Sequence, residues 1–481
     1  MDLSKYFVAA PKVRPYLNIG CLMDIPTGRY LRGKHGESIL NGGLAHVTGV
    51  GGRGNTFKSV LLHFMNERVL DRYCKAVLQL YDTECTVTYA RLEQLAQHMP
   101  NLAGLDLEDS GRVFISDSSV MSGNKWFGGV RDFAEDKAKA AKDWMRTTPF
   151  VDPKTGAMIR SYYPSLFEID SLSMFLTDSV EKIYDENQVG DSKMNTDSLR
   201  GAAAKSQMMM QMPNVAAQHG LHLSMSMHVG DQHALDPNAP PKKQLSFLQQ
   251  GVAFKHVPQK TMFLMNNLWY VMNTRVEMHK EHKTPQYPKN PQDNLVGDKD
   301  LQAITLINLR AKSGPSGMPF EIILSQSEGI LVGLTEYNYL KMNGKYGLGG
   351  NDMRYFLELL PDEQLMRTTI RGKCEENAKL RRALEITSEM CQMQNLWDDE
   401  DEVFCTPAEL YADLKAKGYD WDVILSETRG YWLFEEDAAV EPLKFLSTMD
   451  LLRMRKGLYH PYWMKKVTPP ADAVAETKKA A

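Results

Sequence analysis

The sequence predicts an α/β fold with a mostly parallel central sheet, extended by antiparallel strands at one edge and followed by a smaller, mainly helical C-terminal domain. Two observations carry this prediction. From Gly42 onward short apolar runs alternate with helical patterns, whereas after Thr261 the runs follow one another without long helices. Alternating strands and helices are typical of a parallel sheet covered on both faces, and the later succession favours antiparallel strands added at an edge.

The apolar runs give the expected strands of this sheet. The parallel part is predicted at Leu44–Thr48, Ala76–Tyr81, Val113–Ser116, Leu166–Asp170 and Leu221–His228. The antiparallel part is predicted at Thr261–Met265, Trp269–Glu277, Ala303–Leu309 and Phe320–Leu324. The segment 279–300 is polar and rich in proline, which predicts a loop.

Changes of pattern divide the chain into four parts. We expect an N-terminal arm at 1–20, a core at 21–345, a mainly helical domain at 346–466 and a disordered tail at 467–481. Within the third part, two helical stretches are expected over roughly 352–396. The residues Thr406-Pro407-Ala408-Glu409 form a capping box with proline at the first helical position, so a helix is expected to begin there and to end at Gly418.

Composition narrows the class of protein. No run approaches the roughly 20 apolar residues of a membrane span, and the first residues do not read as a secretion signal. The six cysteines are scattered without a C-x-x-C pair, which argues against a zinc site or a disulfide framework. We therefore expect a cytoplasmic protein without a membrane partner. The net charge of −4 means that any contact with nucleic acid must come from local basic patches.

A glycine-rich loop after the first predicted strand matches a phosphate-binding pattern. Its residues are Gly52, Arg53, Gly54, Asn55, Thr56, Phe57, Lys58 and Ser59. Glycines let successive backbone N–H groups turn toward phosphate oxygens, and the following helix adds the positive end of its dipole. Lys58 is suited to the outer phosphates and Ser59 to Mg²⁺. Phe57 replaces the second glycine of the usual pattern. The expected cofactors are ATP and Mg²⁺.

Polar residues also follow the other predicted strands, where ligands collect in an open α/β sheet. Glu84 follows the second strand, and a carboxylate there is suited to activate water for attack on the γ-phosphate. Asp170 ends an apolar strand and is suited to hold Mg²⁺ or its water shell. His228 ends a further strand, where a polar side chain can sense the γ-phosphate.

In this order the motifs resemble the RecA recombinase family, and most closely its bacteriophage UvsX-like branch. UvsX-type proteins also carry Phe before the P-loop lysine, as at Phe57. The segment Tyr81–Glu84 looks like the one that bears the catalytic glutamate, and Asp170-Ser171 matches the Walker B end. Tyr89 resembles the adenine-stacking tyrosine, although the gap before it is shorter here. His228 matches a position that is Gln in RecA and His in UvsX.

Two further features are similar to devices that join RecA-like subunits. Arg310 and Lys312 alternate at the end of a predicted strand, as in the basic pair that these proteins extend toward the neighbour's γ-phosphate. Phe7 and Ala10 form an F-x-x-A pattern in the arm, by which some RecA-like recombinases dock on the next subunit. The resemblance therefore implies a RecA-type P-loop core that assembles into a helical filament.

The resemblance also implies DNA-binding loops, at about 185–200 and 229–251. The first contains Lys193 and Arg200, and the second contains Lys242 and Lys243 and leads into Lys255. Such cations neutralise phosphates without reading sequence. In the C-terminal domain, Arg453, Arg455, Lys456, Lys465 and Lys466 form a basic cluster with aromatic neighbours, suited either to duplex DNA or to packing on the core.

The expected activity is that of a DNA-dependent ATPase that polymerises on single-stranded DNA and promotes homologous pairing and strand exchange. Its expected partners are single-stranded DNA, further copies of the chain, and a single-strand binding protein or loading factor. In this reading Glu84, Lys58, His228, Arg310 and Lys312 serve hydrolysis. Two alternatives stay open: a hexameric replicative helicase of the DnaB type, and a RecA-like ATPase with a structural or regulatory role.

Overall fold

The computed structural model describes residues 7, 10–11, 13–178, 180–182, 197–232, 245–397 and 403–465, with backbone alone at 197–200 and 202. Within these described residues, the centre of the molecule is a sheet of ten strands. The strands lie in the order β14 (Gly329–Ile330), β13 (Pro319–Ser325), β12 (Leu301–Ala311), β11 (Asn267–Val276), β3 (Val47–Gly52), β9 (Leu221–Asp231), β8 (Ser165–Asp170), β4 (Val77–Asp82) and β5 (Val113–Asp117), and β10 (Val252–Phe254) pairs with β9.

The strands from β11 to β5 are parallel, and β12, β13 and β14 continue the sheet in antiparallel order. The expectation of a mostly parallel sheet with antiparallel strands at one edge is thus confirmed. The expectation for 261–277 was wrong in two respects. Residues 261–264 belong to a helix, α7 (Gln259–Leu264), and β11 runs parallel to β3. Adjacent parallel strands require a crossover, and α7 lies in the connection that brings the chain from β9 to β11.

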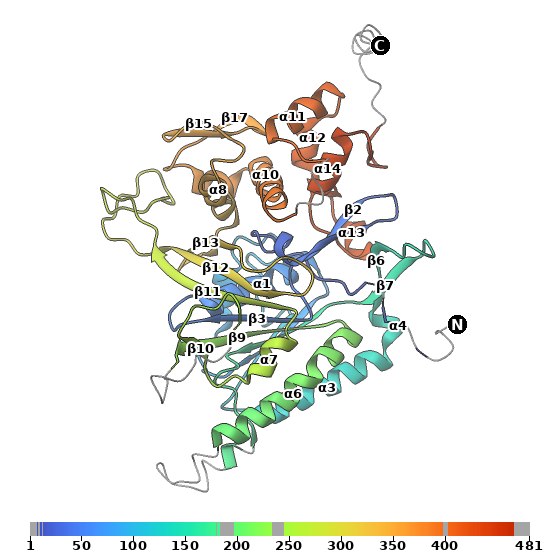
Figure 1. Cartoon of the computed structure of the whole chain (residues 1–481), viewed down its shortest axis with the longest axis vertical. Coiled ribbons are helices and arrows are strands. Elements are labelled where there is room, and N and C mark those ends of the chain that lie inside the picture. The colour runs from blue at the N-terminus through green and yellow to red at the C-terminus, as the bar shows by residue number, and fades with distance from the viewer. Residues whose placement is uncertain are drawn as a thin grey trace.

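Helices cover both faces of the sheet (Figure 1). One face carries α1 (Lys58–Arg72), and the other carries α3 (Gly123–Lys139) and α6 (Asp197–His219). Successive side chains of a strand point to opposite faces. Leu80 accordingly packs with the residues of α1, while the neighbouring Tyr81 packs with those of α3 and α6.

Shorter elements complete the first part of the chain. They are the 3₁₀ turn η2 (Ile25–Thr27), the hairpin of β1 (Arg29–Arg32) and β2 (Ser38–Asn41), the helices α2 (Tyr89–Leu95) and α4 (Ala141–Trp144), and the hairpin of β6 (Met145–Val151) and β7 (Met158–Tyr162). Residues of the expected N-terminal arm already pack on the sheet, since Leu17 pairs with Leu44 and the buried Asn18 donates to the carbonyl groups of Leu40 and Gly42.

The C-terminal part is helical except for small sheets. Its elements are α8 (Val332–Met342), β15 (Leu348–Asn351), β16 (Arg354–Leu357), β17 (Leu360–Leu365), α9 (Ile370–Glu376), α10 (Ala378–Leu396), α11 (Pro407–Ala416), α12 (Trp421–Glu427), β18 (Thr428–Arg429), α13 (Glu435–Val440), β19 (Lys444–Phe445) and α14 (Thr448–Arg455). The capping box at Thr406 and Glu409 is present as expected.

The expected helix over 352–365 was wrong, because these residues form β16 and β17. The reason is a turn at Asn351, whose side chain accepts the backbone N–H groups of Met353 and Arg354 and reverses the chain. The C-terminal part shares a core with the sheet: Ile323 of β13 packs in one cluster with Leu334 of α8 and Leu384 of α10. Within the described part of the chain, none of the helices has the length and apolar character that crossing a membrane requires.

Candidate functional site

The glycine-rich loop joins β3 to α1 through a tight backbone path. A Cβ atom on Gly52 would lie 2.6 Å from Thr56 Oγ1 and 3.0 Å from the Lys58 side chain, so a larger residue there would displace side chains of the loop itself. Two residues of the loop have left-handed backbone, Asn55 with φ 55° and Phe57 with φ 60°. Asparagine tolerates this region better than most residues, whereas phenylalanine does not. The usual pattern has glycine at the position of Phe57, and glycine is the residue that this left-handed backbone favours. The half-buried Phe57 ring packs against the core beneath α1.

Lys58 opens α1 and is only 6% exposed. Its Nζ donates to the carbonyl oxygen of Arg53 at 2.7 Å, and Thr56 Oγ1 donates to the same oxygen at 2.8 Å. Burial lowers the pKa of the Lys58 ammonium, while Asp170 and Glu84 oppose that shift. The ammonium thus lies in the field of both carboxylates. Ser59 follows it in the first turn of the helix and is half-buried.

The ends of β4 and β8 are tied together. The backbone N–H of Thr83 donates to the carbonyl oxygen of Asp170 at 2.7 Å, and the N–H of Ser171 donates to Thr83 Oγ1 at 2.8 Å. The Asp170 carboxylate is 7% exposed and accepts a hydrogen bond from the hydroxyl of Ser226 in β9. A buried, oriented carboxylate at this edge is a suitable ligand for a hydrated Mg²⁺.

Glu84 is held in place by the residue that ends β4. The buried Asp82 carboxylate accepts the backbone N–H groups of Glu84 at 2.8 Å and of Val87 at 2.7 Å, which fixes the loop after the strand. Glu84 Oε1 lies 3.2 Å from His228 Nε2. Both side chains remain partly open to solvent, at 45% exposed for Glu84 and 32% for His228.

The register of the sheet explains why these side chains meet. Gly52 pairs with His228 across β3 and β9, and Asp82 pairs with Asp170 across β4 and β8. All four positions lie at the carboxyl ends of parallel strands, where ligands bind in open α/β sheets. The fold therefore brings Lys58, Ser59, Asp170, Glu84 and His228 to one edge, as the sequence predicts.

Tyr89 is held by the fold rather than directed to the loop. It begins α2, its ring packs against the core on the α1 face, and its hydroxyl accepts the backbone N–H of Ile115 in β5 at 3.1 Å. The hydroxyl of the proposed adenine-stacking residue thus has a structural partner.

Arg310 and Lys312 lie on the side of the glycine-rich loop toward the amino end of β3. Arg310 pairs with Leu268, which in turn pairs with Gly49, three residues before Gly52 along β3. The N–H of Lys312 donates to the carbonyl of Asn266, beside the start of β3, which places Lys312 roughly 17 Å along the strand from Gly52. The Arg310 guanidinium lies 5.8 Å from the centre of the Phe263 ring.

The predicted DNA-binding residues are only partly described. Lys193, Lys242 and Lys243 lie outside the described residues, as does the side chain of Arg200, whose backbone belongs to α6. Lys255 Nζ donates to the carbonyl oxygen of Asp231 at 2.6 Å. Of the basic cluster near the C-terminus, Arg453 donates to Gly36 O and Ser38 Oγ of the β1–β2 hairpin and Arg455 pairs with Asp413. Lys456 and Lys465 are exposed, and Lys466 lies outside the described residues.

Two contacts of the site were not predicted from the sequence. Arg53 in the loop forms an ion pair with Asp231 at the end of β9, with 2.5 Å between Nη2 and Oδ1. Lys205 of α6 donates from its buried Nζ to the carbonyl oxygens of Leu172 at 3.1 Å and His256 at 3.2 Å, and burial lowers its pKa to about 8. A lysine within a methionine-rich helix gives no signal of this role in the sequence.

Comparison with known proteins adds no relative: no protein-family model and no curated protein matches the chain.

Proposed function

We propose that this chain is a DNA-dependent ATPase on a RecA-type core, which forms filaments on single-stranded DNA and promotes homologous pairing and strand exchange. The observation that carries the proposal is the contact of His228 with Glu84 at the same edge of the sheet as Lys58. Such an ATPase needs a base that activates water, a cation that binds phosphate, and a polar side chain near a strand end that leads to the DNA-binding loop. Glu84, Lys58 and His228 are suited to these three roles.

In this proposal the loop residues hold ATP. The backbone of 52–57 and the N-terminus of α1 bind the phosphates, and Lys58 exchanges its bond with Arg53 O for a bond with an outer phosphate oxygen. Ser59 and Asp170 would hold Mg²⁺, which neutralises developing charge on the phosphates when it is bound. Glu84 takes the proton of the attacking water.

His228 connects hydrolysis with DNA. Its Nε2 lies 3.2 Å from the Glu84 carboxylate, and its strand runs on to Asp231 within the segment 229–251, where DNA binding is predicted. A γ-phosphate that accepts a hydrogen bond from His228 competes with Glu84 for the imidazole. The occupancy of the ATP site is thereby transmitted to the end of β9.

Arg310 and Lys312 are assigned to the nucleotide of a neighbouring subunit. They lie toward the amino end of β3, at the levels of Gly49 and Val47, away from the loop of their own chain, and the Arg310 guanidinium lies over the Phe263 ring. Supply of these cations in trans would make hydrolysis depend on assembly, because they stabilise transition-state charge only when subunits are in contact.

A feature at the edge strand β5 supports assembly. An apolar cavity of about 300 Å³ is lined by β4, β5 and α3, with Leu78, Phe114 and Trp126 among its residues. Phe114 is 63% exposed, and Phe7 in the predicted docking pattern is 69% exposed. We assign this cavity to Phe7 of the next subunit, since it has the apolar character that buries an aromatic side chain favourably.

The proposal is tested by measuring ATP hydrolysis and single-stranded DNA binding together, followed by electron microscopy of the complexes. We expect ATP to tighten DNA binding, DNA to stimulate hydrolysis, and long helical filaments to form. Closed rings would instead support the helicase alternative. Hydrolysis without any effect of DNA would support the structural or regulatory alternative.

A further inference from the structure

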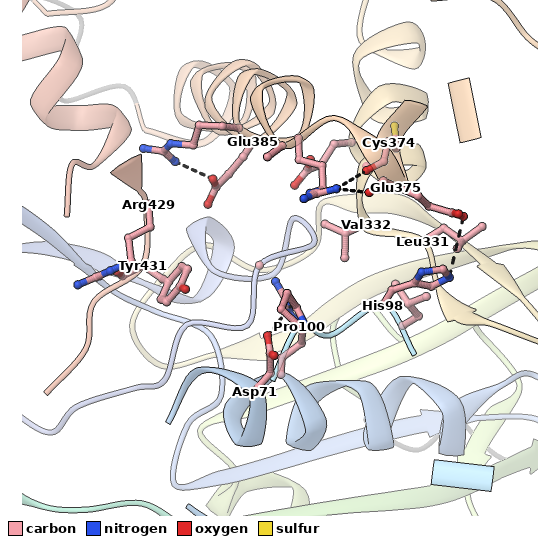
Figure 2. A pocket seen from close by; sticks show the side chains of 18 of the residues that line it. Asp71, His98, Pro100, Leu331, Val332, Cys374, Glu375, Glu385, Arg429 and Tyr431 are labelled. Atoms are coloured by element: carbon pink, nitrogen blue, oxygen red, sulfur yellow. Dashed lines mark hydrogen bonds and ion pairs between the residues drawn. The ribbon is translucent and has the colours of Figure 1, made fainter. Parts of the chain in front are cut away.

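A second charged site lies at the far end of α1. A cavity of about 530 Å³ separates the end of this helix from the C-terminal part of the chain (Figure 2). We call it the arginine cavity. Its charged lining consists of Arg68, Arg72, Arg371, Arg381, Arg382 and Arg429, with the carboxylates Asp71, Glu336, Glu375 and Glu385. In Figure 2 α1 and Asp71 lie below the cavity, and Glu375 and Glu385 lie above it.

Three of these arginines have a carboxylate partner. Arg68 pairs with Asp71 at 3.3 Å, Arg382 pairs with Glu385 at 2.6 Å, and Arg371 pairs with Glu328. Paired guanidinium groups contribute little net charge to the cavity. Carboxylate partners therefore account for the charge of only half of the arginines in the lining.

The other three arginines, within the described residues, donate to neutral acceptors. Arg381 donates to the carbonyl groups of Cys374 and Glu375 at the end of α9. Arg72 and Arg429 donate to backbone carbonyl groups and lie 4.0 and 5.3 Å from the centre of the Tyr431 ring. No carboxylate bonds directly to these three guanidinium groups among the described residues, although Asp24 lies near Arg72 and Glu441 lies near Arg429. Three arginines of the cavity thus have no directly bonded carboxylate and are suited to an anionic ligand.

Several buried donors of the cavity also lack a partner among the described residues. The Nε atoms of Arg72, Arg371 and Arg429 are unpaired, although these residues are only 8%, 5% and 5% exposed. Buried polar groups are normally hydrogen-bonded, and a bound ligand is one means of satisfying them.

One carboxylate of the cavity lacks a hydrogen-bond donor rather than an acceptor. Glu336 is 5% exposed and lines the cavity, and no described residue donates a hydrogen bond to its side chain. Burial raises the pKa of its carboxyl group, and Glu385 and Glu389 raise it further. A ligand that fits here must therefore present a hydrogen-bonding group to Glu336 as well as negative charge to the arginines.

A metal ion does not fit the nearby acidic cluster. His98, Glu328 and Glu375 offer ligand atoms within 4.8 Å of one another. The Glu328 carboxylate, however, is already bonded to both Lys289 and Arg371. Burial raises its pKa, but hydrogen bonds from His98, Lys289 and Arg371 outweigh burial and hold that pKa well below its usual range. The ligand expected from the charge of the cavity is an anion.

We propose that the arginine cavity binds a nucleoside phosphate, with the phosphates on Arg72, Arg381 and Arg429 and a donor of the base or ribose on Glu336. The volume lies within the range of small-ligand pockets. The site is separate from the ATP loop, because Lys58 and Arg72 stand at opposite ends of the 15-residue helix α1, roughly 21 Å apart. Ligand in this cavity touches the same rigid helix whose other end is proposed to hold ATP.

The test uses the full chain with Lys58→Ala, a substitution that is expected to abolish nucleotide binding at the proposed ATP loop. Equilibrium dialysis with ADP is expected to show one site per chain, and pyrophosphate and adenosine are expected to bind more weakly. Arg381→Gln, on the exposed wall, is expected to weaken ADP binding by at least about tenfold. Glu336→Gln is expected to weaken ADP but not pyrophosphate. The matched control is Lys379→Gln, which removes a cation of the same helix outside the cavity.

Three outcomes would overturn the proposal: no ADP bound by the Lys58→Ala chain, pyrophosphate bound as tightly as ADP, or equal losses in Arg381→Gln and Lys379→Gln. Thermal midpoints of the variants identify any loss that is due to unfolding. A failure of the proposed ATPase is distinguishable, since it would appear as unchanged hydrolysis in Lys58→Ala itself.

Discussion

His228 Nε2 lies 3.2 Å from Glu84 Oε1, so a side chain near the carboxyl end of β9 and the carboxylate that follows β4 are in direct contact. The two residues are 144 positions apart in the chain, and the parallel register of β3, β9, β8 and β4 brings them together. A change at one residue is therefore expected to alter the other's position and function.

This contact predicts different defects for the two residues. Glu84→Gln is expected to lower hydrolysis at least about 100-fold while ATP binding remains, because a general base contributes on the order of 10²–10⁴ in rate. His228→Ala is expected to keep ATP binding within about twofold and to lose stimulation by DNA. Steady-state hydrolysis with and without single-stranded DNA measures both. His219→Ala is the control, since His219 bonds its own helix at Val215. Full DNA stimulation in His228→Ala would contradict the proposed link.

The left-handed backbone at Phe57 predicts an order among substitutions. Phe57→Gly relieves a strain of about 1–2 kcal/mol but loses packing of the ring, so we expect a small net change in stability and retained nucleotide affinity. Phe57→Val keeps the strain, adds a β-branched side chain and loses the ring, so it is expected to be the weaker binder. Titration with a fluorescent ATP analogue and thermal unfolding rank the variants. Equal affinity in both would show that the loop is not constrained at this residue.

The position of Arg310 and Lys312 predicts complementation between two inactive chains. The double variant with Arg310→Ala and Lys312→Ala is expected to bind ATP normally and to hydrolyse it poorly. The Lys58→Ala variant is expected not to bind ATP at the loop. In mixed assemblies, some junctions combine an intact loop from the first variant with intact cations from the second. Hydrolysis in the mixture should therefore exceed that of either variant alone. A mixture no more active than its components would place the pair in the site of its own chain.

The assembly cavity predicts the effect of changes in the arm. Phe7→Ala is expected to weaken filament formation and, through the loss of trans cations, to lower DNA-dependent hydrolysis. Phe114→Ala, which truncates the exposed ring that lines the receiving cavity, is expected to have the same effect. Val120→Ala is a control, because Val120 is 76% exposed and does not line this cavity. Light scattering on DNA follows assembly; unchanged assembly in both Phe variants would exclude this docking mode.

A buried ion pair beneath the loop predicts how stability depends on pH. His63 of α1 lies 2.7 Å from Glu168 of β8; burial alone lowers the pKa of His63, but Glu168 outweighs it and raises this pKa to about 9. The contribution of His63 is complete below pH 6.5 and is lost as pH rises toward 9. It is on the order of 3 kcal/mol. Denaturant unfolding should show this decline, and it should be smaller in a variant that combines His63→Leu with Glu168→Leu.

The sequence predicted where the candidate residues lie in the sheet better than it predicted their surroundings. Glu84, Asp170 and His228 were found because each directly follows or ends an apolar run, and parallel strands bring their carboxyl ends to one edge. The position of Arg310 depends on the direction of β11, which an apolar run does not reveal. The arginine cavity was not predicted either, since its arginines come from four elements far apart in the chain, α1, α9, α10 and β18, and only packing brings them together.

The shared core of the sheet and the C-terminal part limits how the chain can be divided. Ile323 of β13 packs with side chains of α8 and α10, and α1 has twelve of its 15 residues buried. A fragment cut at residue 345 would expose the apolar faces of these elements to water together with Arg68 and Arg72. We therefore expect such a truncated chain to aggregate on expression, because the C-terminal part is an integral wall of the core rather than an independently folding module.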